Sequence, residues 1–470
     1  MAESVATSSA SLTAPVSTLV AREPVWVAPD TPVRDAARQM ATLEIGSVLV
    51  QAHGDEPAGI LTDRDLRTRV LAADRPTSTP VGEIASRPLL TLDADAPIVA
   101  AHVAMLDADV RHLVLLRDGA IVGLVSASDL LRHPDGGSFT LVRRLDTDLD
   151  ATLPRYRSLV EDTVAALSAG GLDASHVAPL VSALNDHLVR RLLVRAIEAL
   201  GEPLLAWSWI VFGSEGRREQ TLLTDQDNAL IYDDPSPDGS DDEVDGYFRA
   251  LAERMAADLR TAGFPPCPGG YMATRWRGPR SEWTRRFAGW IETPDPDAML
   301  AASIFFDVRP VAGPLDLTPL DTQITAAGRQ SGFLHHLFET ASIFRPPIGL
   351  FGRLRTDRGA LDLKAGGIAP IVGMARVAGL AAGSLERGSL ARLTAAVDAD
   401  VLARPDRERL DDIFRFLLDL RLRHQLDQKR RDVAVTSSVR LADLSAVDRD
   451  RLKRSLGRVS RLQEALGLRW

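Results

Sequence analysis

The clearest pattern of apolar and polar positions lies in the middle of the chain. Apolar residues fill Trp209–Phe212 and again Asn228–Tyr232, as expected for two buried strands. A Gly-Ser pair ends the first strand, a short charged and helix-prone segment follows, and the second strand begins directly after an Asp-x-Asp pair. Side chains two apart on a strand share a face, so Asp225 and Asp227 are predicted to project together.

This arrangement suggests a site for a metal ion and phosphate. Two adjacent carboxylates repel each other unless a cation lies between them, and hard oxygen ligands suit Mg²⁺ or Mn²⁺. Gly213 lets the backbone approach a ligand closely, and Ser214 with the next N–H groups can hold an anion. The alternative is a solvated strand end, which is the more common fate of an isolated Asp-x-Asp pair.

An internal repeat occupies the region from about residue 14 to 133. Each copy has an extended segment, a helix with apolar residues three and four apart, a short strand, a turn and a Gly-Ile/Leu-x-Thr/Ser motif. The helices are expected at Val33–Leu43 and Ile98–Leu106, and the strands at Ser47–Gln51 and His112–Leu116. The pattern therefore predicts a β-α-β-β-α unit twice over.

Helical spacing dominates the remaining regions. Residues 138–200 are rich in Leu, Val, Ala and Arg, and 316–470 show a similar periodicity. Taken together, the patterns predict an α+β multidomain chain. Its expected parts are a tail (1–13), two repeat units (14–73 and 80–133), a helical connector (134–200), an α/β domain (201–315) and a helical bundle (316–470).

Composition narrows the class of protein. The 470 residues are 45% hydrophobic and 25% charged, as in an ordinary soluble protein. A net charge of −9 argues against a protein whose main partner is nucleic acid. The single cysteine, Cys267, excludes an internal disulfide framework. With no apolar run long enough for a bilayer and no basic, apolar N-terminal signal, we expect a soluble cytoplasmic protein without membrane contact.

Segments of residues 150–470 resemble the nucleotidyltransferase superfamily with the polymerase-beta-like fold. The pattern of that superfamily is Gly-Ser followed about ten residues later by Asp-x-Asp. More closely, the chain is similar to the nucleotidyltransferase-like proteins that accompany CBS domains in bacteria, distant relatives of the uridylyltransferase that acts on the PII signal protein. The segments that carry this resemblance are Gly213–Glu219, Thr224–Asn228, Phe264–Gly270, Ile304–Pro310 and Arg421–Gln425.

The resemblance implies roles for individual residues. Asp225, Asp227 and Asp307 would hold two metal ions, Mg²⁺ or Mn²⁺, and act as the catalytic acids. Phosphate contacts would come from Gly213, Ser214, Arg217 and Arg218, and the helical domain would bring Lys364, Arg421 and His424 to the cleft. For Asp307, the alternative is an internal ion pair with Arg309 or another arginine. The chain departs from its relatives at Gly373, where they tend to have Asp.

The Trp- and Arg-rich segment between residues 275 and 290 is open to two interpretations. Its arginines and tryptophans could bind a triphosphate and stack a base. Alternatively, the tryptophans belong to a helical core and the arginines to the surface.

The repeat resembles a tandem pair of CBS domains. In that family the Thr/Ser and Asp of the motif hold an adenine nucleotide, and the matching residues here are Thr62 with Asp65 and Ser126 with Asp129. A plain helix N-cap is the alternative, and both can be true because a capped helix start is itself an anion site. Paired CBS modules commonly associate face to face, so a homodimer is expected.

The reaction expected from these motifs is transfer of an NMP group from an NTP to a protein or small-molecule acceptor, regulated by adenine nucleotide at the CBS pair. A catalytically silent, nucleotide-sensing regulatory protein is the alternative from another class. A nucleic-acid polymerase or tRNA end-adding enzyme is disfavoured by the acidic balance.

Overall fold

The computed structural model describes residues 12–132, 137–222, 224–236, 241–349 and 353–468. The chain divides into two compact units, Met1–Thr140 and Leu141–Trp470, which we describe separately. Most of the predicted tail, residues 1–13, lies outside the described residues. Leu12 is buried, and its carbonyl accepts a hydrogen bond from the amide of Val99 (3.1 Å), so this end of the predicted tail is packed.

The first unit contains the same small fold twice. Its two sheets have the orders β1-β2-β3 and β4-β5-β6, and in each the first strand is parallel and the third antiparallel to the middle one. The elements of the first copy are β1 (Trp26–Val27), α1 (Val33–Leu43), β2 (Ser47–Val50), β3 (Gly59–Thr62) and α2 (Asp63–Asp65). Those of the second are β4 (Thr91–Asp93), α3 (Ile98–Asp107), β5 (His112–Arg117), β6 (Ala120–Ser126) and α4 (Ala127–Arg132).

Periodicity explains the packing of each copy. In α1 the buried positions Val33, Ala36 and Met40 lie three and four residues apart, and they pack in one apolar cluster with strand residues such as Val48 and Leu61. The apolar side chains on one face of the helix and those on the facing side of the strands therefore form one core.

The second unit is built around a four-stranded sheet with the order β10-β7-β8-β9. Every residue of the two central strands is buried, which explains why their sequences are almost wholly apolar. β8 pairs antiparallel with β7 and parallel with β9. The strands are β7 (Trp207–Val211), β8 (Asn228–Tyr232), β9 (Arg277–Pro279) and β10 (Arg309–Ala312).

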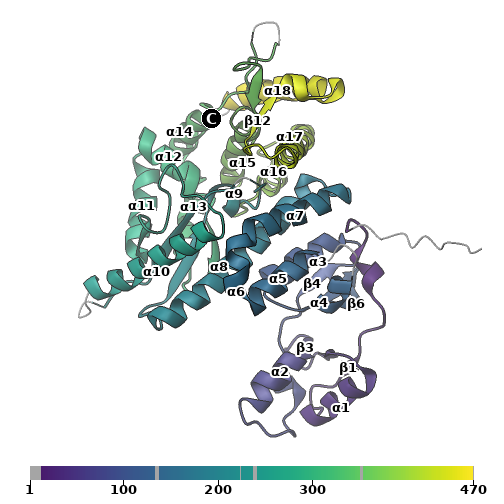
Figure 1. Cartoon of the computed structure of the whole chain (residues 1–470). Helices are drawn as coiled ribbons and strands as arrows, with labels where there is room; N and C mark the ends of the chain where they lie inside the picture. Colours follow the sequence, from purple (N-terminus) through teal and green to yellow (C-terminus); the bar gives the residue numbers. More distant parts are fainter. Residues whose placement is uncertain (1–11, 133–136, 223, 237–240, 350–352, 469–470) are drawn as a thin grey trace, which may run out of the picture. The chain divides into compact units, whose positions relative to one another are not determined.

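Helices cover this sheet and form the C-terminal bundle (Figure 1). α5 (Gly137–Thr147) spans the boundary between the two units. The helices that precede the bundle in the second unit are α6 (Leu149–Thr152), α7 (Tyr156–Ala169), α8 (Ala174–Leu200), α9 (Gly213–Gly216), α10 (Asp241–Thr261), α11 (Arg280–Glu292) and α12 (Pro296–Phe305). The bundle contains α13 (Thr318–Ala327), α14 (Ser331–Ala341), α15 (Ala369–Ala381), α16 (Ser389–Asp398), α17 (Arg404–Arg430) and α18 (Ala446–Gly467). A two-stranded sheet, β11 (Ala360–Asp362) with β12 (Ser438–Arg440), joins two segments of the bundle.

The Trp- and Arg-rich segment packs around Phe305, which favours the second interpretation. Trp283 is fully buried, and the rings of Trp276 and Trp290 lie 4.5 and 5.3 Å from that of Phe305. The guanidinium of Arg286 covers the Trp276 and Trp283 rings at 5.4 and 5.2 Å. An aromatic cluster of this kind stabilises the fold.

The predicted α+β fold class is confirmed. Among the described residues, no helix has the length and apolar character needed to cross a membrane.

Candidate active site

Gln226 sets the direction in which the two neighbouring carboxylates point. Its buried side chain donates to the carbonyls of Ala256 (3.2 Å) and Phe264 (3.0 Å), and its backbone N–H donates to the carbonyl of Pro265 (3.0 Å). Because successive side chains of an extended segment alternate, Asp225 and Asp227 leave the opposite side of the chain. The predicted shared face is therefore present.

Three donor side chains meet on that face. One ligand atom each from Asp225, Asp227 and Cys267 lies within 4.8 Å of the others. Burial and the neighbouring carboxylate of Asp225 raise the pKa of Asp227 to about 6, although the Cys267 thiol donates a hydrogen bond to it. Burial and the carboxyl of Asp227 raise the pKa of the Cys267 thiol to about 11. The site thus concentrates negative charge that its surroundings only partly compensate.

The Gly-Ser turn lies against this group. Gly213 has φ +61°, and a Cβ built on it would lie 3.3 Å from Oδ2 of Asp227. Glycine therefore provides both the backbone conformation and the close approach. Ser214 is half-buried in the first turn of α9, beside Gly213. The side chain of Arg218 forms an ion pair with Asp186, and a guanidinium nitrogen lies 3.9 Å from Oδ2 of that residue.

The structure corrects the prediction for Asp307. This fully buried carboxylate receives hydrogen bonds from three guanidinium groups, those of Arg217, Arg376 (2.6 and 3.1 Å) and Arg392 (2.5 Å). Burial alone would raise its pKa, but the three cations hold the pKa of Asp307 well below its usual range. Both oxygens are occupied, so Asp307 is not a third metal ligand; the ion-pair alternative is correct, with partners other than Arg309.

Arg217 belongs to the same cluster. Its guanidinium also donates to Glu219 (2.7 Å), whose other oxygen accepts from the backbone N–H of Ser389 (2.6 Å) at the start of α16. Burial would lower the pKa of Arg217, but Asp307 and Glu219 outweigh it and raise the pKa above its ordinary value. Arg217 therefore links the Gly-Ser turn to the bundle, and its predicted phosphate contact competes with these bonds.

Lys364 is the bundle residue that faces the carboxylates. It follows β11, remains open to solvent and interacts electrostatically with Asp225 and Asp227. Packed neighbours and the nearby guanidinium of Arg421 lower its pKa, while the two carboxylates act in the opposite direction. A cation near the acidic pair is well placed to meet an anionic ligand there.

Arg421 and His424 hold the bundle together. Arg421 is buried and donates to the hydroxyl of Ser437 (2.9 Å), and burial lowers its pKa to about 10. His424 lies one turn further along α17, with Nε2 2.9 Å from the carbonyl of Ser438. Both residues thus fasten α17 to the segment of β12, and of the three predicted bundle residues Lys364 has the clearest relation to the acidic pair.

The two CBS motifs have matching geometry. The hydroxyl of Thr62 donates to Oδ2 of Asp65 (2.6 Å), and the hydroxyl of Ser126 donates to Oδ2 of Asp129 (2.6 Å). The backbone N–H groups of Thr62 and Ser126 reach the same carboxylate oxygens at 2.9 and 2.8 Å. The backbone N–H groups of Asp65 and Asp129 in turn donate to the hydroxyls of Thr62 and Ser126, at 3.4 and 3.3 Å. The N-cap interpretation is therefore confirmed at both motifs, and nucleotide binding there remains a prediction.

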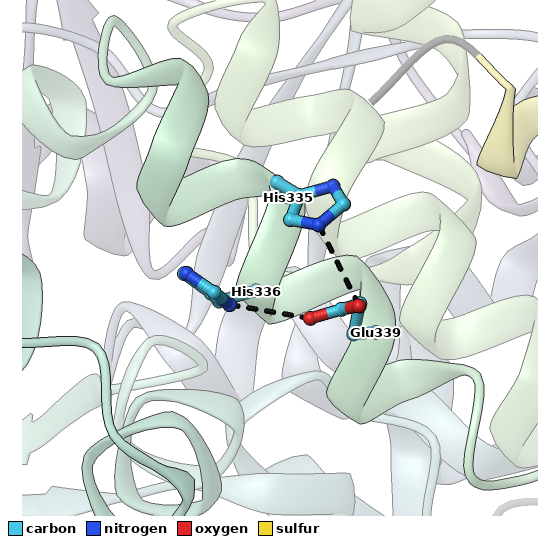
Figure 2. A group of neighbouring side chains, drawn as sticks. All are labelled: His335, His336 and Glu339. Atoms are coloured by element: carbon cyan, nitrogen blue, oxygen red, sulfur yellow. Dashed lines mark hydrogen bonds and ion pairs between the residues drawn. The ribbon is translucent and has the colours of Figure 1, made fainter.

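A second group of potential metal ligands lies on the exposed face of α14. Figure 2 shows the imidazoles of His335 and His336 on two sides of Glu339, at 3.5 and 3.2 Å from its carboxylate oxygens. Residues three and four apart on a helix meet in this way, and such exposed pairs need no metal ion.

Sequence reasoning missed several residues that shape the site. Arg376 and Arg392 are buried in apolar helices, and an arginine in such a run signals a carboxylate partner elsewhere in the chain. Gln425 accepts from the amide of Leu222 (3.3 Å) and fixes the loop before Asp225. Cys267 lies in a segment with several turn-forming residues, and its position beside Asp227 depends on tertiary contacts.

Family models match most of the chain. The CBS domain model matches residues 16–72 and 81–136, the model described as "Putative nucleotidyltransferase DUF294" matches 158–297, and that of its substrate binding domain matches 331–470. The chain belongs to this family of CBS-domain-containing nucleotidyltransferase-like proteins.

Curated relatives are similar over shorter stretches. The CBS domain-containing protein CBSX3, mitochondrial, of Arabidopsis thaliana is 30% identical over 23% of this chain and 55% of its own length. Hypoxic response protein 1 of Mycobacterium tuberculosis is 32% identical over 21% of this chain and 69% of its own length. The chain spans little more than half the length of the first two relatives it matches, at 55% and 58%.

Solved structures also resemble part of the chain. A conserved protein from Pyrococcus horikoshii is 29% identical, with a TM-score of 0.25, over 26% of this chain and 92% of that one. A CBS domain protein from Pyrobaculum aerophilum, solved in complex with AMP, is 25% identical, with a TM-score of 0.24, over the same shares.

We predict that Asp307→Asn destabilises the second unit. The substitution leaves three buried guanidinium groups without a full counter-charge, which typically costs about 3–5 kcal/mol of the free energy of unfolding. Urea unfolding followed by tryptophan fluorescence measures this effect, because six of the seven tryptophans lie at or beyond Trp207. The matched control, Asp450→Asn, removes an exposed partner of Arg454 and should cost less than about 1 kcal/mol. Equal stability of both variants would refute the role given to Asp307.

For Asp227→Asn we predict a gain in the free energy of unfolding near neutral pH, in contrast to the loss predicted for Asp307→Asn. A pKa near 6, above the ordinary 3.8, means that the folded protein retains a proton that the unfolded chain has already released between about pH 4 and 6. Ionised Asp227 therefore costs stability as pH rises through this window. Near pH 7.5, without divalent ions, Asp227→Asn should raise the free energy of unfolding by about 1–3 kcal/mol, and the gain should vanish toward pH 4.

Thermal unfolding at both pH values tests this prediction. Asp233→Asn is the control at the other end of β8, since Asp233 pairs with Arg280 at 2.8 Å and should give no gain. A lower thermal midpoint for Asp227→Asn than for the wild-type protein near neutral pH would contradict the expected stabilisation.

Proposed function

We propose that the chain transfers an NMP group from an NTP to a hydroxyl of a protein or small-molecule acceptor, releasing pyrophosphate. The observation that carries this proposal is the convergence of Asp225 and Asp227 beside the Gly213 turn. A half-buried pair of carboxylates next to a backbone that a phosphate can approach suits a divalent ion with a triphosphate. Membership of the nucleotidyltransferase-like family supports the same reaction class.

Each residue of the site has a task in this reaction. Asp225 and Asp227 would hold Mg²⁺ or Mn²⁺, which supplies positive charge for the triphosphate and for an ionising acceptor hydroxyl. Gly213 and Ser214 would let the phosphates lie against the backbone, and the ammonium of Lys364 would meet one of them from the bundle. Gln226 keeps the two carboxylates on one face and so orients both.

Transfer of label from α-labelled NTPs tests the proposal. Purified full-length protein, each NTP, Mg²⁺ or Mn²⁺, and a cell extract as acceptor source should give labelled acceptor and pyrophosphate. Asp225→Ala/Asp227→Ala should reduce both products to the level without protein, since the metal ligands are gone. The control Asp233→Ala/Asp234→Ala removes two acids from the other end of β8 and should keep the activity.

The outcomes separate the two classes of function. Metal-dependent NTP binding without label transfer under any condition would support the alternative, a catalytically silent nucleotide sensor. Activity that survives loss of Asp225 and Asp227 would place the reaction elsewhere.

We further propose that the CBS pair binds adenine nucleotide and regulates the transfer reaction, with the chain acting as a homodimer. The matching Thr62–Asp65 and Ser126–Asp129 pairs support this, since each presents a carboxylate at a helix start where ribose hydroxyls and phosphate could bond. The CBS family assignment supports the same ligand class.

Calorimetric titration with AMP and ATP tests the CBS sites. Asp65→Ala and Asp129→Ala each remove a charged acceptor, so each should weaken binding at its own motif about tenfold. Because the two motifs have the same geometry, each variant is the control for the other. Unchanged titrations in both variants would show that these carboxylates do not hold the nucleotide.

A further inference from the structure

The chain's single cysteine lies on a loop that is fixed against the acidic pair. Gln226 bonds to the carbonyls of Phe264 and Pro265, just before the cysteine. After it, the N–H of Gly270 donates to the carbonyl of Cys267 (2.9 Å) and closes a turn. The hydrogen bonds of Gln226 that orient Asp225 and Asp227 therefore also fix the loop that carries the thiol.

The thiol lies close enough to these carboxylates for all three side chains to share one metal ion. Its sulfur and one oxygen from each acid lie within 4.8 Å of one another, so small side-chain rotations would bring all three around one ion. The Cys267 thiol already donates a hydrogen bond to Asp227, so it faces that carboxylate.

In the described part of the chain, no third carboxylate belongs to this group of potential ligand atoms. Asp307, the acid expected there, has both oxygens bonded to Arg217, Arg376 and Arg392. The donor set that the fold brings together is thus two oxygens and one sulfur.

We propose that Cys267 is the third protein ligand of the ion held by Asp225 and Asp227. This inference rests on the metal assignment made under the proposed function. Two carboxylates alone suit Mg²⁺ or Mn²⁺, whereas a thiolate adds affinity for a borderline ion such as Zn²⁺ or Co²⁺. On binding, the sulfur gives its proton to solvent and a metal–sulfur bond forms. The sulfur therefore gives the centre a higher affinity for a softer ion than the Asp-x-Asp motif alone would have.

Co²⁺ titration of the reduced, full-length protein tests the assignment, with a phosphine as reductant. One equivalent should produce a thiolate-to-cobalt charge-transfer band, which can come only from Cys267 because the chain has one cysteine. Cys267→Ser should abolish the band and weaken Co²⁺ binding about tenfold or more, while Mg²⁺ binding changes less. Circular dichroism checks that the variant is folded.

Two further variants isolate the site. His335→Ala/His336→Ala removes the other group of potential ligands (Figure 2) and should leave the band intact. Asp225→Asn/Asp227→Asn should abolish it. In wild-type protein, Co²⁺ should also protect Cys267 from a thiol reagent, a readout that does not depend on any substitution.

The possible results are distinct. Saturation with Co²⁺ without a charge-transfer band, or equal Co²⁺ affinity in Cys267→Ser, would overturn the sulfur ligand. Failure to bind either Co²⁺ or Mg²⁺ would overturn it together with the metal assignment. The band without NMP transfer would retain the ligand and reject only the proposed activity.

Discussion

The ion cluster around Asp307 is the interaction on which the second unit depends. This residue lies in the turn between α12 and β10, and its three guanidinium partners come from the end of α9, from α15 and from α16. Four charged groups are stable away from water only when they remain together, because each alone would carry a large desolvation cost. The sheet, the Gly-Ser turn and the helical bundle are thereby fixed to one another, and Lys364 keeps its relation to the acidic pair.

Buried and half-buried carboxylates in this unit fall into two electrostatic classes. Asp307 is neutralised by the protein, and its pKa lies below the ordinary value. Asp227 is only partly compensated, and its pKa is raised to about 6. The pKa of Glu215, which is buried one turn after β7, is raised further, to about 8, by burial and by the carboxylate of Asp186. A carboxylate whose charge the fold does not balance indicates where a cationic ligand would be stabilised. A carboxylate that is balanced by neighbouring cations indicates a structural role.

The sequence predicted local features well and long-range partners poorly. Asn228–Tyr232 and Val33–Leu43 have the predicted bounds, because apolar periodicity is a local signal. The role of Asp307 was wrong because its partners lie 69, 85 and 90 residues away in sequence, and no local pattern encodes that meeting. The glycine at position 373 likewise meets a tertiary requirement. A Cβ there would lie 2.5 Å from Cβ of Ala341, so α14 approaches α15 too closely for a carboxylate.

The Gly-Ser-Glu-Gly turn illustrates how one short motif serves both classes of carboxylate. Gly213 has a positive φ and lies against Asp227. Gly216 faces the other way, and a Cβ built on it would lie 2.0 Å from the backbone oxygen of Asp307. Any larger residue there would displace Asp307 from its arginines, or move Arg217 together with the turn. The spacing of the two glycines therefore couples the candidate metal site to the cluster that holds the bundle, so the motif has a packing requirement in addition to its expected contact with phosphate.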